Sequence, residues 1–428
     1  MTILEADWTW TGARFEAGVA VELGDDGRIA SVGSTAGRPT TRLERRALLP
    51  GFVNAHSHAF QRGLRGSGET FPRDKGSFWT WREAMYGLVS RMDAETLHRL
   101  TTACFREMLR SGITTVGEFH YLHHDHTNDG WAFDEVVLDA ARTAGIRIVL
   151  LETYYQEGGF GKALEPAQHR FQAHGVEPFF RNWDRLRDAV DGSLASLGVV
   201  VHSVRAATVA DLAAVCRGAA DRGAVLHMHL EEQWQEIHDC REATGGTPMA
   251  LVLEHGVVDE RFTGVHCTHT TPDDMARFLD AGATVCVCPL TEANLGDGLC
   301  DLGWIRERGG TVSVGTDSNA RIDFFEELRW LELGQRLREE KRGVWFDERG
   351  AVAPRLLQAA TTSGARSLGV EAGTLEAGKL ADCFTVDLDR AGLAHVPPGG
   401  LDAALTFGVG AEVVDRVWVH GREVDLVR

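Results

Sequence analysis

The feature that most constrains this 428-residue sequence is an alternation, from about residue 47 to 318, of short β-branched runs with longer amphipathic stretches. Such an alternation predicts repeated β/α units and a parallel sheet. The eight runs are GFVNAHSH (51–58), TTVGEFH (114–120), RIVLLETYY (147–155), LGVVVHSV (197–204), AVLHMHLEE (224–232), FTGVHCTH (262–269), TVCVCPL (284–290) and TVSVGTDS (311–318). Nearly every run ends in His, Asp, Glu or Tyr. Because polar residues from many strands meet at one end of a closed barrel, the pattern favours an α/β fold of the (β/α)8 TIM-like type over an open doubly wound sheet.

The stretches between the runs carry signals for helix starts and stops. Thr208 and Thr271 precede acidic residues as N-capping residues do, and glycines stand where helices should end. The helices that this predicts include 95–111, 133–144, 208–222 and 271–282, which are followed by Gly112, Gly145, Gly223 and Gly282.

The segments outside this alternation predict β structure and a lid. Residues 1–46 and 373–428 alternate short strands with Gly and Asp turns, so we expect them to pair into one small β-sandwich domain. Residues 47–372 then form the barrel domain. Segment 60–93 is far longer than a βα loop of about two to six residues, which predicts a functional lid over the barrel mouth.

Composition excludes several classes of partner. The chain has 44 Lys plus Arg against 62 Asp plus Glu, a net charge of −18, and no basic run that would follow a nucleic acid backbone. The eight cysteines are scattered without a C-x-x-C pair, so we expect buried free thiols in a reducing compartment. No signal peptide and no run of about 18 uncharged apolar residues is found, which predicts a cytoplasmic protein without a membrane partner.

A metal site is predicted where the runs end. His56 and His58 lie two residues apart on a strand, so both imidazoles can point at one ion. Such a pair alone is weak, because a histidine at a strand end often only binds a carbonyl. His229, His266 and Asp317 close runs five, six and eight, at the end where barrel active sites lie. Three neutral imidazoles and one carboxylate suit Zn²⁺ with a position left for water, whose pKa falls from about 15.7 to about 7.

Other histidines near these runs are less suited to the ion. His227 lies two residues deeper in its strand than His229 and should pack within the barrel. His269 follows His266 by three residues and should face away or leave the strand. His202 ends run four with no lysine nearby to bridge two metals, so we expect one ion.

Three charged residues near the predicted mouth have alternative interpretations. Glu232 lies just beyond the fifth run and would act as a general acid if burial raises its pKa; otherwise it is an exposed loop glutamate. Arg82 and Arg205 would each bind a carboxylate by paired hydrogen bonds; otherwise each forms a salt bridge with a rim acid.

These residues resemble the amidohydrolase superfamily over essentially the whole chain. The resemblance lies in LLPGFVNAHSH, in the His and Asp that close runs five and eight, and in GTLEAGKLAD. Within the superfamily, the sequence is similar to the iminohydrolases of N-formimino-L-glutamate in histidine degradation. The motifs shared with them are HSHAFQR, SFWTWREAMY, GEFHYLHHDH, HSVRA, HxHxxEQ and EELRWLELGQRL.

The resemblance implies a site and a reaction. Hydrolytic deimination of the substrate, an anionic small molecule, would give N-formyl-L-glutamate and ammonia. The enzyme would be a homodimer. Asn319 stands where the pattern has a histidine, and we expect it to lie outside the metal ligands. The implied residues are His56, His58, His229 and Asp317 for one divalent ion, favouring Zn²⁺; Glu232, His266 and Asp317 for catalysis; and Gln61, Arg82, Tyr121, His202 and Arg205 for the substrate.

Two alternatives stay open at this point. A nucleobase deaminase on the same scaffold would recognise a neutral ring by stacking and amide donors, and would make poor use of two arginines. A metal-free scaffold protein, as among dihydropyrimidinase-like relatives, would have no reason to keep all four ligands and Glu232.

Overall fold

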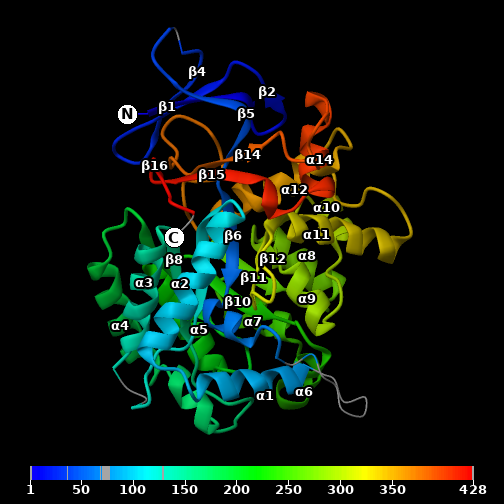
Figure 1. The fold of residues 1–428 in the computed structure, drawn as a ribbon. Helices are drawn as coiled ribbons and strands as arrows, with labels where there is room; N and C mark the ends of the chain where they lie inside the picture. Colours follow the sequence, from blue (N-terminus) through cyan, green and yellow to red (C-terminus); the bar gives the residue numbers. More distant parts are fainter. Residues whose placement is uncertain (1, 36, 68, 70–77, 128–129, 427–428) are drawn as a thin grey trace.

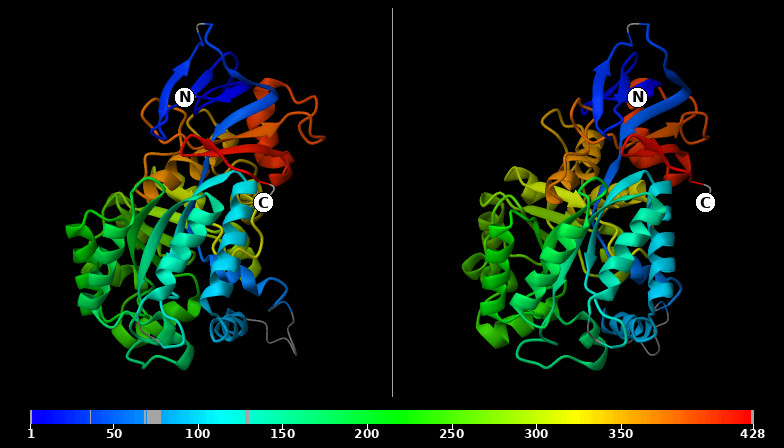
Figure 2. Two further views of the ribbon diagram at one scale, coloured as in Figure 1. Left: turned by 60° about the vertical axis from the view of Figure 1, so that its left-hand side comes forward. Right: turned by 90° about the vertical axis from the view of Figure 1, so that its left-hand side faces the viewer.

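The computed structural model describes residues 2–35, 37–67, 69, 78–127 and 130–426. Within them, a parallel barrel surrounded by helices lies beneath a separate sheet that both ends of the chain build (Figure 1). Figure 2 shows the same two parts from the side, with both chain termini on the part that holds this second sheet.

Parallel strands form the barrel, and each overlaps one of the predicted runs, although β7 begins one residue and β9 two residues before its run. Their order in the sheet runs from β13 back to β6 without a crossover. An isolated parallel bridge between Ser57 and Asp317 joins the last segment to the first, so the barrel is nearly closed. The strands are β6 (Phe52–Ser57), β7 (Ile113–His120), β8 (Arg147–Tyr154), β9 (Ala195–Val201), β10 (Leu226–Leu230), β11 (Phe262–His266), β12 (Thr284–Val287) and β13 (Thr311–Val314).

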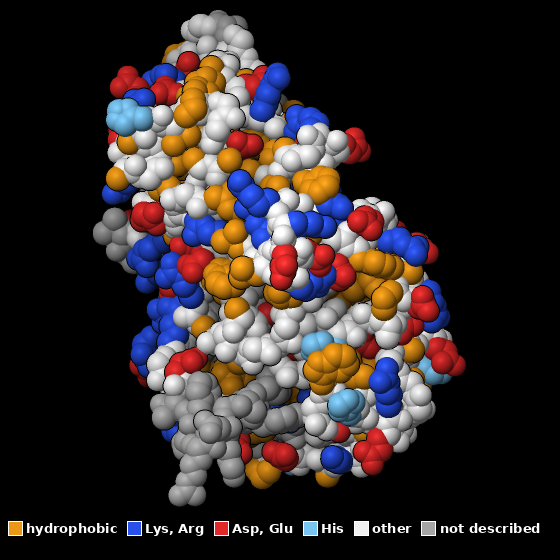
Figure 3. Space-filling model, turned by 90° about the vertical axis from the view of Figure 1, so that its right-hand side faces the viewer, with side chains coloured by type: hydrophobic (Ala, Val, Ile, Leu, Met, Phe, Trp, Pro, Cys, Tyr) orange, Lys and Arg blue, Asp and Glu red, His pale blue; other side chains and the backbone are white. Residues whose placement is uncertain are grey.

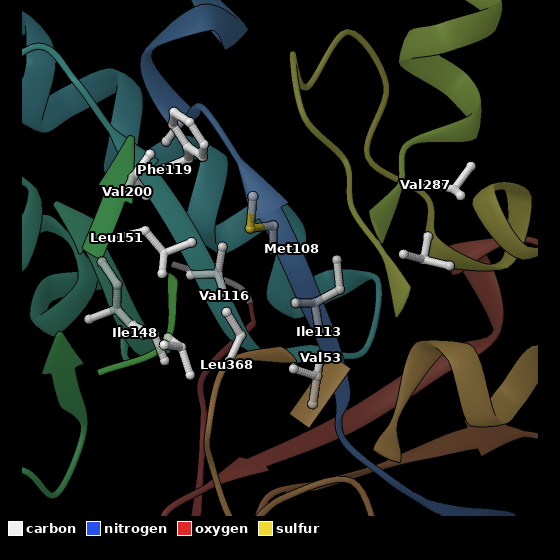
Figure 4. Packing of buried hydrophobic residues seen from close by; sticks show 14 of the residues in the cluster. Val53, Met108, Ile113, Val116, Phe119, Ile148, Leu151, Val200, Val287 and Leu368 are labelled. Atoms are coloured by element: carbon white, nitrogen blue, oxygen red, sulfur yellow. The ribbon is translucent and has the colours of Figure 1, made fainter. Parts of the chain in front are cut away.

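Apolar side chains on these strands form the barrel core. Val53, Val116 and Leu151 are fully buried, and Figure 4 shows them packed with Leu368, the residue that follows helix α13 (Thr362–Ser367). Burial of apolar surface contributes about 25 cal/mol per Å², so this core is the main source of the barrel's stability.

Helices between the strands begin and end where the sequence predicts. The side chain of Thr208 accepts a hydrogen bond from the Asp211 N–H, and that of Thr271 accepts one from the Asp274 N–H. The helices are α1 (Phe78–Val89), α2 (Ala94–Arg110), α3 (Ala132–Ala144), α4 (Val176–Ala189), α5 (Val209–Asp221), α6 (Trp234–Thr244), α7 (Pro248–His255), α8 (Pro272–Asp280), α9 (Pro289–Leu295), α10 (Leu302–Glu307), α11 (Phe324–Glu339), α12 (Val352–Ala360), α13 (Thr362–Ser367) and α14 (Leu401–Gly408), with short 3-10 helices η1 (Ala59–Leu64), η3 (Pro166–Phe171), η4 (Pro398–Gly400) and η5 (Ala411–Val413).

The two terminal segments meet in one sheet, as their strand patterns predict. Strand β5 pairs with β1 on one side and with β14 on the other, which joins the two ends of the chain. The strands connect into a single mixed sheet rather than two stacked sheets, and the domain boundaries stay a prediction. The sheet contains β1 (Thr2–Trp10), β2 (Phe15–Glu16), β3 (Ala20–Leu23), β4 (Ile29–Gly33), β5 (Thr41–Pro50), β14 (Cys383–Asp387), β15 (Val414–Val419) and β16 (Arg422–Glu423).

The predicted lid segment crosses the end of the barrel that lies farthest from the terminal sheet (Figure 1). It contains η1 and α1, whereas residues 68 and 70–77 of it lie outside the described part. That this segment acts as a lid stays a prediction.

The surface and the thiols agree with the composition. All eight cysteines are free and buried, as predicted. On the face shown in Figure 3, acidic and basic side chains are interspersed among separate hydrophobic ones. Among the described residues, none of the helices has both the length and the apolar character needed to cross a bilayer.

Candidate active site

Three histidines and one aspartate converge at the carboxyl ends of the barrel strands. His56 is in β6, His58 directly follows it, His229 is in β10, and Asp317 is in the loop after β13. Nε2 of His229 lies 3.2 Å from Nε2 of His56 and 3.3 Å from Nε2 of His58. Oδ1 of Asp317 lies 3.3 Å from Nε2 of both His56 and His58. We call these four buried residues the floor.

Hydrogen bonds show which imidazole nitrogens face the centre of the floor. His58 Nδ1 lies 2.8 Å from the carbonyl oxygen of Phe119, and His229 Nδ1 lies 3.1 Å from that of His202. A carbonyl oxygen only accepts, so each Nδ1 carries the hydrogen and each Nε2 presents a lone pair. Because two lone pairs this close repel unless a cation lies between them, the floor fits a divalent ion.

Burial keeps the floor histidines neutral, as metal ligands must be. It lowers the pKa of His58 to about 3 and holds the pKa of His229 well below its ordinary value. Burial would raise the pKa of Asp317, but its contact with His56 and the other nearby histidines outweighs this and lowers it. Three neutral nitrogens and one carboxylate form the donor set that zinc prefers.

The loop after β13 holds the floor aspartate in place. Asp317 and Asn319 have φ of 45° and 55°, a conformation that residues other than glycine seldom adopt. Asn319 Nδ2 donates to the Asp317 carbonyl at 2.9 Å and to Ser57 Oγ at 3.1 Å, so it supports the loop. A Cβ at Gly315 would lie 2.7 Å from Cβ of His56, so this position requires glycine.

Glu232 and His266 lie beside the floor. His266 Nε2 lies 3.9 Å from Glu232 Oε1 and 3.7 Å from Asp317 Oδ2. Burial raises the pKa of Glu232 to about 7, which suits a group that exchanges a proton near neutral pH. Both Glu231 and Glu232 are buried, so the alternative of an exposed loop glutamate is wrong.

Glu292, at the start of α9, is a partner that the sequence did not reveal. Its Oε1 accepts from the Cys288 N–H at 2.9 Å and lies 3.1 Å from Nδ1 of His266. Burial would lower the pKa of His266, but Glu232, Glu292 and Asp317 outweigh it and raise this pKa well above its ordinary value.

The two histidines that were judged less suited to the ion lie outside the floor. His227 is buried and its Nε2 lies 2.8 Å from the carbonyl oxygen of Ser367. His269 follows the end of β11 and stacks on Trp234, with ring centroids 4.3 Å apart. Each ring therefore has a structural partner.

A pocket of about 420 Å³ opens above the floor. Its walls include every residue that was predicted to bind the substrate, together with three of the four floor residues. The predicted substrate residues on its lining are Gln61, Arg82, Tyr121, His202 and Arg205. Glu232 and His266 also line it, so the residues predicted for proton transfer and those predicted for substrate binding share one cavity.

The two arginines of the pocket have different contacts. Arg82, on α1, donates from Nε to the hydroxyl oxygen of Tyr86 at 2.7 Å. Arg205 Nε lies 3.5 Å from Oε1 of the buried Glu236, so the salt-bridge alternative holds in part for this arginine. Arg205 also lines the cavity.

Tyr86 and Tyr155 line the pocket, and neither was predicted, because no local pattern marks them. Their shared partner Gln168 is buried outside the lining and was not predicted either. Gln168, in η3, donates to the hydroxyl oxygens of both Tyr86 and Tyr155. We call Arg82, Tyr86, Tyr155, Gln168 and Arg205 the rim.

Glu118 also escaped prediction, and it lies beneath the floor. Its Oε1 accepts from the Ala59 N–H at 2.6 Å, one residue after His58. Burial raises the pKa of Glu118 to about 8.

Two histidines of GEFHYLHHDH, His120 and His123, form a second buried cluster with Asp134, apart from the pocket. Asp134 Oδ1 lies 3.0 Å from Nε2 of His120 and 3.0 Å from Nδ1 of His123. His123 Nε2 lies 2.8 Å from the Thr153 carbonyl oxygen. These contacts anchor the chain on both sides of Tyr121 to α3 and β8.

Comparison with known sequences reveals relatives over nearly the whole chain. A model described as the amidohydrolase family matches residues 47–424. A formimidoylglutamate deiminase of Pseudomonas aeruginosa is 37% identical over 413 residues, which cover 95% of this chain and 90% of the relative. A 5-methylthioadenosine/S-adenosylhomocysteine deaminase of Moorella thermoacetica is 30% identical over 379 residues, 87% of this chain and 80% of the relative.

Solved structures share the architecture. An amidohydrolase from Brucella melitensis superimposes with a TM-score of 0.89 at 32% identity, covering 99% of this chain and 94% of its own. An adenosine deaminase from Xanthomonas campestris, solved with bound zinc, superimposes with a TM-score of 0.82 at 25% identity, covering 99% of this chain and 92% of its own.

Proposed function

The chain belongs to the amidohydrolase family of metal-dependent hydrolases, and we propose that it converts N-formimino-L-glutamate to N-formyl-L-glutamate and ammonia. The reaction hydrolyses a C–N bond of a small molecule. The observation that carries the proposal is that Arg82 and Arg205 line the same pocket as the floor, because the substrate combines an amidine with two carboxylates. The similarity to the Pseudomonas deiminase supports the same substrate.

The floor would hold one divalent ion, for which Zn²⁺ is the proposed identity. His56, His58, His229 and Asp317 would bind it through three neutral nitrogens and one carboxylate oxygen. When bound, such an ion supplies Lewis-acid chemistry that makes water acidic enough to act as a nucleophile at neutral pH.

The residues beside the floor would then accept and donate the protons of the reaction. The free carboxylate oxygen of Asp317 lies 3.7 Å from Nε2 of His266. Asp317 would take the proton of the attacking water, and His266, kept protonated by its acidic neighbours, would stabilise the negative charge that develops. Glu292 fixes the His266 ring through Nδ1, which leaves Nε2 directed at the reacting atoms. Water oxygen forms a bond to the formimino carbon as the C=N bond opens.

Glu232 completes the reaction by transferring a proton to the former imino nitrogen. The proton taken from the attacking water then passes to the same nitrogen, the C–N bond breaks and ammonia leaves. The carbon keeps the water oxygen as a formyl C=O, and the remaining hydrogen of that oxygen returns to Glu232. Gln61, Tyr121 and His202 line the wall near the floor and would orient the formimino group. Arg82 and Arg205 would bind the carboxylates by charge-assisted hydrogen bonds.

A nucleoside or nucleobase deaminase is the second candidate. The pocket contains the aromatic side chains of Trp81, Tyr121 and Phe171, on which a ring can stack, and the Moorella relative has a deaminase name. The pocket would then place the positive charge of two arginines against a neutral ring, which disfavours this candidate.

Ammonia release across a substrate panel tests the proposal. Metal-loaded protein is incubated with N-formimino-L-glutamate, N-formimino-L-aspartate, guanine, adenosine and 5-methylthioadenosine, and kcat/KM is measured for each. We expect N-formimino-L-glutamate to be preferred and equimolar N-formyl-L-glutamate to form. Preferred turnover of any purine would replace this function with the second candidate.

We also propose a cytoplasmic homodimer. The eight buried free thiols support a reducing compartment. Light scattering of the purified protein measures the oligomeric state, and a monomer at micromolar concentration would contradict the dimer.

A further inference from the structure

The pocket holds most of the phenolic hydroxyl groups of this protein. The chain contains four tyrosines, and Tyr86, Tyr121 and Tyr155 line the pocket. Only Tyr121 was predicted to bind the substrate. Tyr86 lies on α1 and Tyr155 directly follows β8, so the other two reach the pocket from separate parts of the chain.

A buried glutamine fixes the orientation of these two hydroxyl groups. Gln168 is completely buried in η3, and its Oε1 accepts from the Glu165 N–H at 2.7 Å. That backbone donor settles which end of the amide is oxygen. The Nε2 group therefore faces the tyrosines, and it donates to Tyr155 Oη at 2.8 Å and to Tyr86 Oη at 3.0 Å.

These contacts leave the hydroxyl hydrogens for another acceptor. Tyr86 Oη accepts from Gln168 Nε2 and from Arg82 Nε, which occupies both of its lone pairs. Tyr155 Oη accepts from Gln168. Within the described part of the chain, no carbonyl or carboxylate oxygen lies within hydrogen-bond distance of either hydroxyl. Each O–H group is thus a donor without an acceptor on the wall of a cavity.

The charges around the two hydroxyls favour an anion as that acceptor. Arg82 contacts Tyr86, and Arg205 lines the same cavity, where the carboxylates of Glu236 and Glu232 raise its pKa against the effect of burial. Burial, the neighbouring Tyr155 and the Glu165 carboxylate raise the pKa of Tyr86, so the hydroxyl keeps its hydrogen at neutral pH.

We propose that the Tyr86 and Tyr155 hydroxyl groups, oriented by Gln168, donate hydrogen bonds to one carboxylate of the substrate beside Arg82 and Arg205. The inference rests on the proposed function and makes the two tyrosines residues that determine specificity. Arginines attract any anion, whereas two neutral donors held in fixed directions add a geometric requirement that a planar carboxylate can meet.

Removing single oxygen atoms tests the inference. Tyr86→Phe and Tyr155→Phe keep the rings. Tyr154→Phe is the matched control because Tyr154 is buried, adjacent to Tyr155 in sequence and absent from the pocket lining. In metal-loaded enzyme, we expect each of the first two to raise KM for N-formimino-L-glutamate about 10-fold or more, with kcat nearly unchanged. The control should keep the wild-type KM.

Two analogues separate binding of a carboxylate from a general effect on the pocket. N-formimino-L-glutamine lacks the side-chain carboxylate, and 4-formiminoaminobutyrate lacks the α-carboxylate. The loss caused by Tyr86→Phe and Tyr155→Phe should vanish for one analogue and persist for the other. Equal losses for both analogues would indicate a structural role and overturn the inference.

Gln168→Glu provides a second test that preserves side-chain volume. A carboxylate at this position accepts hydrogen bonds from the tyrosines, which turns their O–H groups away from the pocket. We expect KM to rise at least as far as in the Tyr→Phe variants, with an unchanged circular dichroism spectrum. A wild-type KM in Gln168→Glu would contradict the proposed orientation.

The failures of the two proposals are distinguishable. If wild-type enzyme leaves N-formimino-L-glutamate intact and prefers a purine, the proposed function itself fails. If wild-type enzyme is active on N-formimino-L-glutamate and both Tyr→Phe variants keep its KM, only the inference about the hydroxyl groups fails.

Discussion

The floor of the pocket stands on barrel strands, whereas the rim stands on helices and loops that lie above them. His56 and His229 take their positions from the hydrogen-bonded parallel strands β6 and β10. Arg82 takes its position from Tyr86, and Tyr86 contacts Gln168 from a different segment. The floor is thus positioned by the backbone of the fold, and the rim by contacts between side chains.

The two regions should therefore control different parts of the reaction. As proposed, the floor would supply ligands and proton carriers for hydrolysis of C–N bonds in general, since relatives named for different substrates match this chain over most of its length. The rim adds positive charge and oriented donors, which suit one class of substrate. Variants of the floor should therefore abolish turnover of every substrate, and variants of the rim should change the preference among substrates.

Loss of the ion should have the largest effect. Asp317→Asn removes the anionic ligand, and chelation of wild-type protein removes the ion itself; both should lower kcat by at least about 10³-fold because the Lewis acid is lost. Elemental analysis should find one equivalent of metal in wild-type protein and little in Asp317→Asn. Full activity in protein shown to be free of metal would contradict the role of the floor.

Glu232→Gln should have the next largest effect. The amide keeps the shape of the side chain but transfers no proton, so kcat should fall about 10²- to 10³-fold while the metal content stays at the wild-type value. Loss of the metal in this variant would instead make Glu232 a ligand. The neighbouring Glu231→Gln, which is buried away from the pocket lining, serves as the control.

Arg82→Met and Arg205→Met should each weaken binding of N-formimino-L-glutamate. Each removes one charge from the rim while keeping the apolar stem, and a charged pair protected from water is worth about 2 kcal/mol or more, which is about 30-fold in KM. Metal content should not change. A wild-type KM in both variants would remove the arginines from substrate recognition.

Glu118→Gln should have the smallest effect on turnover and a measurable effect on stability. The folded-state pKa of Glu118, about 8, lies above its unfolded value, so the folded protein binds the proton more tightly. Its contribution to stability is complete below about pH 4.5 and declines as the pH rises toward 8. Urea unfolding measures the free energy of unfolding at pH 5 and at pH 8. Between these two pH values, the wild-type protein should lose up to a few kcal/mol more of this free energy than Glu118→Gln does. Parallel losses in the two proteins would contradict this.

The sequence predicts much of the barrel because its rules are local. Alternation along β6 puts His56 and His58 on one face, and the eight runs all become strands in chain order. Thr208 and Thr271 cap helices as predicted because a cap depends on only three or four neighbouring residues. Local sequence patterns were therefore sufficient to predict the strands, the helix caps and the residues at the strand ends.

The rim shows where local patterns stop being informative. Gln168 and Tyr86 meet only because η3 and α1 cross the same end of the barrel, and neither residue stands in a periodic or capping pattern. Glu292 was not predicted either, because its contact with His266 joins β11 to helix α9, which follows β12, and no local pattern indicates such a contact. The single sheet of the terminal segments depended on β5 pairing with β14, which no local signal specifies.

The most direct test of the division between floor and rim is the ratio of kcat/KM for N-formimino-L-glutamate to that for N-formiminoglycine. It is measured in wild-type protein and in the double variant Arg82→Met/Arg205→Met, each with its metal content determined. We predict a ratio of about 10² or more in wild-type protein, which falls by at least about 30-fold in the double variant while the metal content stays the same. A ratio that survives the double substitution would contradict the account, because the preference for the dianion would then come from residues other than the rim arginines.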